Sequence, residues 1–330
     1  MLTNPGHEYP RPTPLIVPSL QLSVLIPTHN PHLGRLQRAL AGLRAQTLPV
    51  DQWETVLVDN SSSPALVAAD WSAQAPENFR LVREAQTGLS HARQRGFTEA
   101  RGDFAVLVDD DNVLAPDYLA TTLALFEQHP QIGVLGGRSL PEFESLPAAW
   151  TKEFYPLLAL RDLGAAPLLS QGLRPARSVR NEYPAFAPIG AGMALRRSAW
   201  TAWLEACRDQ SGLISDRKGT ELTSGGDNDI VLCALRAGRE VGYFPALCLT
   251  HLIPPSRLEP HYLARLNRGI QKSWMQVLTR HDANPWPPLT PAGATLRQFK
   301  AWFTHQAWSS PSARIRWQGA CGHFEGRIKP

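Results

Sequence analysis

The sequence predicts an α/β fold in which helices flank a central, mostly parallel sheet. Short apolar runs rich in β-branched residues alternate with segments whose apolar residues recur at helical spacing, as in successive βαβ units. Three of the apolar runs end directly in polar residues. Ligands of parallel sheets bind beyond the carboxyl ends of the strands, so these three ends are expected to converge on one crevice.

The elements follow in order along the first half of the chain. Buried strands are predicted over residues 22–27, 53–58, 79–82, 104–108 and 132–135. Helices are predicted between them over residues 31–44, 64–74, 90–100 and 117–128. In the first of these helices, the apolar residues at positions 33, 36, 40 and 43 share one face.

The pattern loosens after residue 140. A long loop is expected over 164–188 and a strand of small apolar residues near 189–195. Helices are expected over 198–207 and over 230–237, the second closed by Gly238. Two short strands, 241–244 and 247–249, precede His251, and the remaining chain is expected to be helical.

Composition excludes several classes of protein. With 43% hydrophobic and 19% charged residues in 330, the chain can bury a core and is not disordered. A net charge of +4 without a long basic block argues against nucleic-acid binding. We expect neither a membrane span nor a signal peptide, because the apolar runs are too short. The four cysteines are scattered and form no CxxC pair, which fits a protein of the reducing cytoplasm.

The polar strand ends carry the first candidate chemistry: Pro27–Asn30, Asp59–Ser61 and Asp109–Asp111. Three adjacent carboxylates repel one another unless a cation compensates, and Mg²⁺ or Mn²⁺ holding a diphosphate would do so. A solvated acidic turn explains the same triplet. The Asp59 segment fits either a turn or a contact with a nucleoside.

Each of three later segments also has two interpretations, one structural and one functional. In Gly88–Gly96, Arg93 is either a phosphate or base contact near a helix N-terminus or a solvated surface arginine. Asp227 and Asp229 begin a helix, so each is either a cap or a general base. His251 is either a structural histidine or a partner of Asp111 in a metal site.

Taken together and in order, six segments resemble family 2 glycosyltransferases. They are Leu25–Asn30, Val56–Ser62, Gly88–Gly96, Leu107–Asn112, Gly225–Asp229 and His251–Pro254. The resemblance covers about residues 21–260, and the chain is similar to the bacterial members with a single catalytic domain that build cell-surface polysaccharide. It implies a Rossmann-like sheet of the A-type nucleotide-diphospho-sugar transferase fold, and an inverting transfer that depends on Mn²⁺ or Mg²⁺.

The resemblance also implies roles for individual residues. The donor would be bound by Pro27, Thr28, Asn30, Asp59, Asn60, Arg93, Asp109 and Asp110. Asp111 and His251 would hold the metal, and Asp227 would be the catalytic base. The acceptor side would include Trp150, Gly190, Gly192, Met193 and Asp229. Gly226 stands where the family often has Glu.

We therefore expect a flexible proline-rich arm (1–20), a catalytic domain (21–258) and a helical C-terminal extension (259–330). The nucleotide-sugar-binding half would span 21–137 and the acceptor-binding half 138–258. The donor would carry UDP, GDP or dTDP, and the acceptor would be a glycan or lipid-linked saccharide. Five tryptophans among basic residues in the extension fit either a membrane surface or packing against the domain or a dimer partner.

Competing functions lack their motifs. A dehydrogenase would need GxGxxG after the first strand, where Pro-Thr-His-Asn stands. A nucleotidyltransferase would need a Gly-rich basic loop there, and a processive synthase would add membrane helices. A catalytically degenerate nucleotide-sugar or glycan-binding module remains the alternative.

Overall fold

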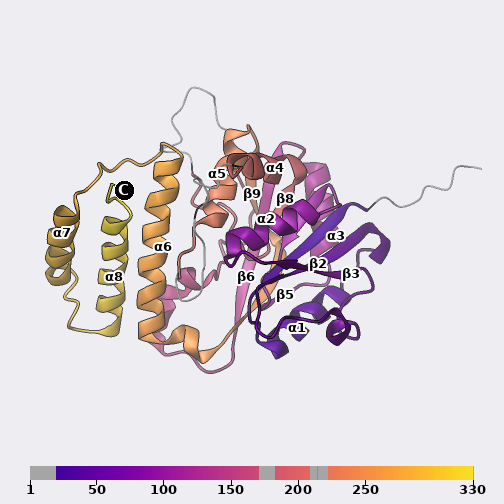
Figure 1. The fold of residues 1–330 in the computed structure, drawn as a ribbon, viewed down its shortest axis with the longest axis horizontal. Helices are drawn as coiled ribbons and strands as arrows, with labels where there is room; N and C mark the ends of the chain where they lie inside the picture. The colour runs from indigo at the N-terminus through magenta and orange to yellow at the C-terminus, as the bar shows by residue number, and fades with distance from the viewer. Residues whose placement is uncertain (1–19, 171–182, 209–213, 215–221, 330) are drawn as a thin grey trace, which may run out of the picture.

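A computed structural model describes residues 20–170, 183–208, 214 and 222–329. Among these residues, nine strands form one sheet with helices on both of its faces, and three further helices lie beside it (Figure 1). The path of the sheet is β3-β2-β1-β4-β8-β6-β9-β5, and β7 pairs with β9. The predicted α/β class is confirmed. The arm and much of the 164–188 loop fall outside the described residues.

The first half of the sheet is parallel, as predicted. β1 (Leu22–Thr28) lies between β2 (Trp53–Asn60) and β4 (Phe104–Leu107), and β3 (Phe79–Glu84) extends the sheet beyond β2. Every residue of β1 and β2 is buried. Unbroken apolar runs are expected of strands covered on both faces.

The second half of the sheet is mixed. Its strands are β5 (Asn112–Leu114), β6 (Ile132–Phe143), β7 (Leu168–Leu169), β8 (Ala194–Arg196) and β9 (Glu240–Ile253). β6 and β9 are parallel, whereas β8 runs antiparallel to β4 and β6, and β5 and β7 run antiparallel to β9. The antiparallel pair β5–β9 matters most, because it brings the acidic triplet next to His251.

Helices cover both faces of the sheet. One face packs against α1 (Leu33–Arg44) and α3 (Tyr118–Gln128). The other packs against α2 (Leu89–Glu99), α4 (Arg197–Ala206) and α5 (Gly226–Arg236). Helix α1 buries the leucines at 36, 40 and 43, as its spacing predicted.

The C-terminal helices are α6 (Pro260–Arg280), α7 (Pro291–Thr304) and α8 (Pro311–Glu325). Helix α6 lies against the sheet body, and α7 and α8 form the outer edge (Figure 1). No helix in the described ranges has both the length and the apolar character needed to cross a bilayer. The predicted helical extension is confirmed, whereas its domain boundary at 258/259 stays a prediction.

Three predicted elements differ in the structure. The segment 64–74 contains only a short 3-10 helix, η2 (Ala68–Trp71), because the loop after β2 is tied back to Asp59. The two strands expected at 241–244 and 247–249 are one strand, β9, with a register shift opposite Gly136–Arg138. The strand expected at 189–195 is confined to β8, since residues before it turn at Gly192 (φ 72°).

Candidate active site

The polar ends of β1, β2 and β4 meet at one cavity of about 260 Å³. It is lined by Pro27, Thr28, His29, Asn60, Thr87, Gly88, Leu89, Ala92, Asp109, Asp110, Asp111, Ala159, His251 and Arg257. The cavity therefore brings together five of the eight residues predicted to bind the donor and both predicted metal ligands. The convergence expected from the parallel sheet is confirmed.

Two predicted donor residues, Asn30 and Asp59, do not line the cavity. Asn30 accepts a hydrogen bond from the backbone N–H of Ser63 at 2.8 Å, and its own N–H donates to Ser62 at 2.9 Å. The buried carboxylate of Asp59 accepts from the backbone N–H groups of Ser62 and Leu66 at 3.0 and 3.1 Å. Both side chains shape the loop after β2.

Asn60 fixes the turn that opens helix α2 onto the cavity. Its Oδ1 accepts from the backbone N–H of Gly88 at 2.7 Å, and its Nδ2 donates to the carbonyl of Gln86 at 2.7 Å. Gly88 has φ 140°, which a residue with a Cβ rarely adopts. The first turn of α2 follows and borders the cavity at Leu89 and Ala92. A helix N-terminus attracts anions, so this wall suits a phosphate.

The acidic triplet supplies the opposite charge at the same cavity. Asp110 accepts a short hydrogen bond from the hydroxyl of Thr28. Burial raises the pKa of Asp110 to about 7, with the charge of Asp111 as the second cause. Asp110 is partly exposed where it meets the cavity, but protein encloses its other sides. Carboxylates held this close favour the binding of a cation.

Asp111, His251 and Arg257 form one buried cluster at the end of the triplet. The β5–β9 pairing sets Asn112 opposite His251, which places Asp111 Oδ1 3.3 Å from His251 Nε2. Arg257 comes from the short helix η6 (Pro255–Leu258), and its Nη2 lies 2.8 Å from Asp111 Oδ2. Sequence reasoning assigned Arg257 no role. The clue in the sequence is that Arg257 follows the predicted metal ligand His251 by six residues.

The residues of this cluster offer ligand atoms to a divalent ion, but Arg257 already contacts both of them. Its Nη2 lies 2.8 Å from Asp111 Oδ2 and its Nη1 lies 3.2 Å from His251 Nε2, so a bound ion would replace these contacts. Asp111 and His251 offer a carboxylate oxygen and an imidazole nitrogen, both of which Mn²⁺ accepts. The ring atom His251 Nδ1 is buried and has no hydrogen-bond partner among the described residues, so the ring is not locked by a second acceptor. Two protein ligands leave coordination positions for phosphate oxygens, as is usual for Mg²⁺ sites.

The predicted base lies at a separate point, beside Gly190. Asp227, at the start of α5, accepts from the backbone N–H of Gly190 at 3.1 Å. A Cβ on Gly190 would lie 2.6 Å from Arg93 Nη2 and 3.6 Å from Asp227 Cβ, so the glycine keeps these two groups close. None of the three residues lines the 260 Å³ cavity.

Asp229 has a different environment from Asp227. It is 1% exposed and bonds Trp203 Nε1 at 2.8 Å, Arg280 Nη1 at 2.8 Å and His281 Nε2 at 2.7 Å. Asp229, Cys233 and His281 are the one group of three or more His, Cys, Asp or Glu side chains in the described residues whose ligand atoms all lie within 4.8 Å of one another. In this group, the guanidinium of Arg280 already pairs with the Asp229 carboxylate that a metal ion would need. Asp229 thus links α5 to α4 and to the end of α6.

The remaining acceptor-side residues do not line the cavity. Met193 is fully buried, and the Gly192 carbonyl accepts from the hydroxyl of Tyr118 at 2.6 Å. Trp150 lies in the 3-10 helix η3 (Ala149–Leu158) and packs edge-on against Phe154. Of the five, only Gly190 lies next to Asp227.

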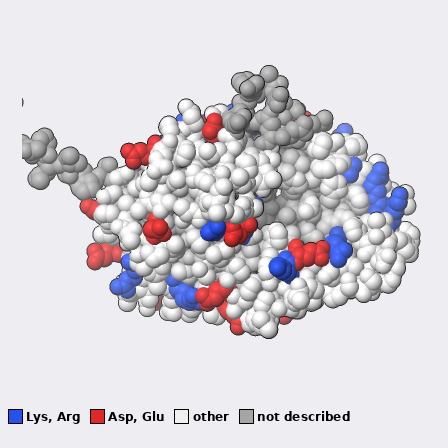
Figure 2. All heavy atoms as spheres, turned by 180° about the vertical axis from the view of Figure 1, so that it is seen from behind, with Lys and Arg blue, Asp and Glu red and all other residues white. Residues whose placement is uncertain are grey.

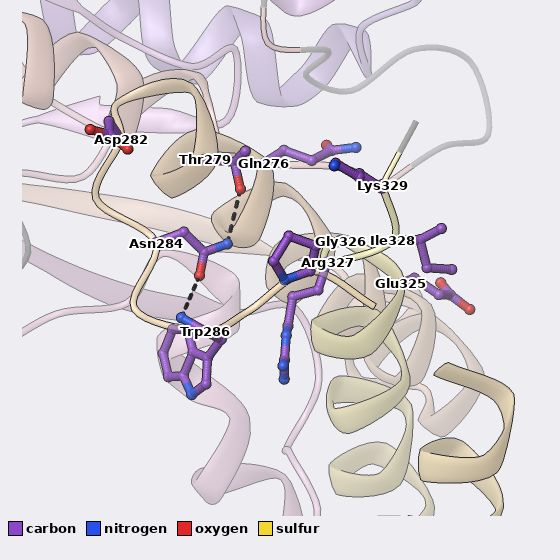
Figure 3. Close-up of a pocket in the computed structure, with 11 residues that line it drawn as sticks. Gln276, Thr279, Asp282, Asn284, Trp286, Glu325, Gly326, Arg327, Ile328 and Lys329 are labelled. Carbon is purple, nitrogen blue, oxygen red and sulfur yellow. Dashed lines mark hydrogen bonds between the residues drawn. The ribbon is translucent and has the colours of Figure 1, made fainter. Parts of the chain in front are cut away.

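A larger cavity, of about 400 Å³, lies between the end of α6 and the C-terminal end of α8 (Figure 3). Asn284 crosses it, donating to Thr279 Oγ1 at 2.9 Å and accepting from the N–H of Trp286 at 3.0 Å. No predicted site residue lines it. The candidate site is therefore identified by its chemistry and its place at the sheet edge, not by size.

The sheet edge combines an acidic triplet, a helix N-terminus and an arginine, and this set of charges is chemically suited to a diphosphate together with a cation. Over residues 23–202 the chain matches the family described as "Glycosyl transferase family 2". This match covers more than half of the chain, and the protein belongs to that family.

Individual relatives are similar over shorter stretches. The chain is 33% identical over 104 residues to the succinoglycan biosynthesis protein ExoW of Rhizobium meliloti, covering 30% of this chain and 32% of that protein. It is 31% identical over 117 residues to the uncharacterized protein y4gI of Sinorhizobium fredii, covering 34% and 13%. The matched stretches thus span a third or less of these relatives. The crystal structure of S. aureus TarS 1–349 aligns with TM-score 0.48 and 13% identity, covering 93% of this chain and 90% of that one.

Proposed function

We propose that this protein transfers a sugar from a nucleotide-diphospho-sugar to a hydroxyl group of a glycan or lipid-linked acceptor, with inversion at the anomeric carbon. Family membership supports the class of reaction. The observation that carries the donor site is the cavity where the α2 N-terminus and Arg257 face the acidic triplet. Opposite charges at one small cavity match a diphosphate bound with a divalent cation.

In the proposed reaction, Asp227 takes the proton of the acceptor hydroxyl. The acceptor oxygen bonds to the anomeric carbon as the bond from that carbon to the diphosphate breaks, and the electron pair leaves with the nucleoside diphosphate. Asp111 and His251 would hold Mn²⁺ or Mg²⁺, which supplies positive charge to the departing diphosphate. Arg257 and the first N–H groups of α2 would stabilise the same charge.

Asp227 is favoured over Asp229 as the base because of its surroundings. Asp227 is partly exposed beside Gly190, whereas both oxygens of Asp229 already bind buried partners. A base must be able to reach an acceptor hydroxyl. Arg93, beside Gly190, would then lie between the donor and acceptor sides.

The printed name of one relative supports a proposal for the biological setting. ExoW is named for succinoglycan biosynthesis, so we propose that the product is a surface polysaccharide or glycoconjugate. Cytoplasmic location, contact with the inner membrane face and a homodimer remain predictions.

The test is a calorimetric titration of the full chain with UDP, GDP and dTDP, each with and without Mn²⁺. We expect one nucleotide to bind only when the metal is present. Binding without any transfer or hydrolysis of the matching nucleotide sugar, across a panel of acceptors, would favour the degenerate-module alternative. Absence of binding by folded protein would contradict the donor site.

A further inference from the structure

Helix α7 exposes an aromatic face at the outer edge of the molecule. Its exposed side chains are Leu296 (68% exposed), Phe299 (63%) and Phe303 (54%), and Trp308 (59%) follows just after the helix. Every exposed Phe or Trp of the described residues lies between positions 286 and 308. We call Leu296, Phe299, Phe303 and Trp308 the aromatic ridge. Such a concentration marks an interaction surface rather than scattered surface residues.

The ridge is one preformed surface. The ring centroids of Phe299 and Phe303 are 5.1 Å apart, and those of Phe303 and Trp308 are 5.8 Å apart, both in edge-to-face arrangement. Trp302 lies 6.3 Å from Trp308 and packs edge-on against Trp317 of α8 at 4.7 Å. The exposed rings are therefore anchored to the buried side of the helix pair.

Helix α7 already has its packing partner on the opposite side. Ala294 and Ala301, seven residues apart, are buried, and Trp317 Nε1 of α8 donates to the carbonyl of Gln298 at 3.0 Å. At about 100° per residue, the ridge positions point away from these two alanines. The aromatic face is thus additional to the face that holds α7 in the fold.

The charge around the ridge is of one sign. The stretch Ala283–Phe324 contains four Lys or Arg and no Asp or Glu, although the whole chain has 33 basic and 29 acidic residues. Lys300 and Arg297 of α7 and Arg314 of α8 are exposed. In Figure 2, blue side chains gather without red ones at the edge that α7 and α8 form. An apolar ridge with basic flanks complements a partner whose outer layer is anionic and whose inner layer is apolar.

We propose that the aromatic ridge of α7 is a membrane-docking surface, which inserts its side chains into the interfacial layer of a bilayer that contains anionic lipids. Trp and Phe favour this layer, and flanking Lys and Arg add attraction to anionic headgroups. A second copy of the chain fits less well, because a symmetric contact would bring Arg297 and Lys300 of both copies together. This proposal does not depend on the proposed catalytic activity.

The test is flotation of the full chain with vesicles of phosphatidylcholine alone or mixed with phosphatidylglycerol. We expect binding to the anionic vesicles that weakens as salt is added. Phe299→Ser with Phe303→Ser should weaken this binding by at least about tenfold, since two large apolar side chains no longer insert. Arg297→Gln with Lys300→Gln should lower binding to anionic vesicles specifically.

Leu296→Ser and Leu146→Ser form a matched pair, because Leu146 is 98% exposed but lies outside α7. Only the first should reduce vesicle binding. Equal losses, or no binding of the folded wild type to either vesicle, would overturn the proposal. So would a dimer in light scattering that Phe299→Ser with Phe303→Ser converts to a monomer, which would make the ridge an interface between copies. All variants should keep the wild-type unfolding temperature, since the ridge side chains are exposed.

Discussion

At the scale of single residues, the site is organised by charges that neutralise one another. Asp111 contacts Arg257 at 2.8 Å and His251 at 3.3 Å, and Asp110 accepts from Thr28. Without a bound cation, the negative charge of the aspartates in this cluster is offset by the guanidinium of Arg257 and by protonation of Asp110. Two predictions follow from that balance.

The first concerns the pH dependence of stability in the absence of metal. The pKa of Asp110 in the folded protein is about 7, raised by burial and by Asp111. Between its unfolded pKa, near 4, and 7, the folded state holds a proton that the unfolded state has lost. Stability contributed by this group is therefore complete below pH 4 and is lost as pH rises through 7. Asp110→Asn should reduce the fall in melting temperature between pH 5 and pH 8, measured with a chelator present. An unchanged pH profile would contradict it.

The second concerns the arginine that sequence reasoning did not assign. Arg257→Gln should weaken metal-dependent nucleotide binding by about 10- to 100-fold, because it removes the charge-assisted hydrogen bond that we propose Arg257 makes to the diphosphate. Arg257→Lys should retain part of the affinity. Arg138→Gln is the control, since Arg138 pairs with Asp162 at 3.1 Å away from the cavity. Calorimetry measures all three variants, and equal effects at Arg138 and Arg257 would refute the assignment.

At the scale of elements, the sequence predicts the first half of the sheet well. The strands β1, β2 and β4 are rich in apolar residues, and the acidic triplet begins two residues after the end of β4, so topology alone brings their ends together. The second half was harder. The proline at position 245 and a register shift interrupt the pattern of β9, so that one strand looks like two. The site contact between Asp111 and His251 depends on the antiparallel β5–β9 pair, and β5 has only three residues.

Asp227 and Asp229 show what sequence cannot separate. Both lie in the first turn of α5 and both fit a cap or a base. Their difference comes from long-range neighbours, since Trp203, Arg280 and His281 are distant in sequence and surround only Asp229. A one-dimensional pattern carries no signal for contacts of this kind.

The two aspartates give the third prediction. Asp229→Asn should lower the free energy of unfolding by about 3–5 kcal/mol, because it removes the buried carboxylate that bonds Arg280 and His281. Asp227→Asn should change stability by less than about 1 kcal/mol and abolish transfer, since its side chain is partly exposed. Urea unfolding and a transfer assay measure both effects. A stable, active Asp227→Asn would remove it as the base.

At the scale of the whole molecule, α6 connects the sheet body to the C-terminal helices. Its last residue, Arg280, and the following His281 bind Asp229 of α5, and α6 packs closely on α8 along its length. The approach to α8 is tight at Gly322, where a Cβ would lie within van der Waals overlap of the backbone carbonyl oxygen of Arg268. Strain introduced between α6 and α8 should therefore reach the sheet body, which bears on the predicted boundary at 258/259.

The fourth prediction tests that coupling. Gly322→Ala should lower the free energy of unfolding by about 1–3 kcal/mol, because a methyl group meets backbone that cannot rotate away. Gly34→Ala, in the exposed first turn of α1, is the control and should be neutral or slightly stabilising, since its Cβ would have ordinary contacts. If α6 couples the two parts, calorimetry of Gly322→Ala shows one transition shifted to lower temperature. A second, separate transition that alone shifts would show that the C-terminal helices unfold independently, and would support a domain boundary near residue 258.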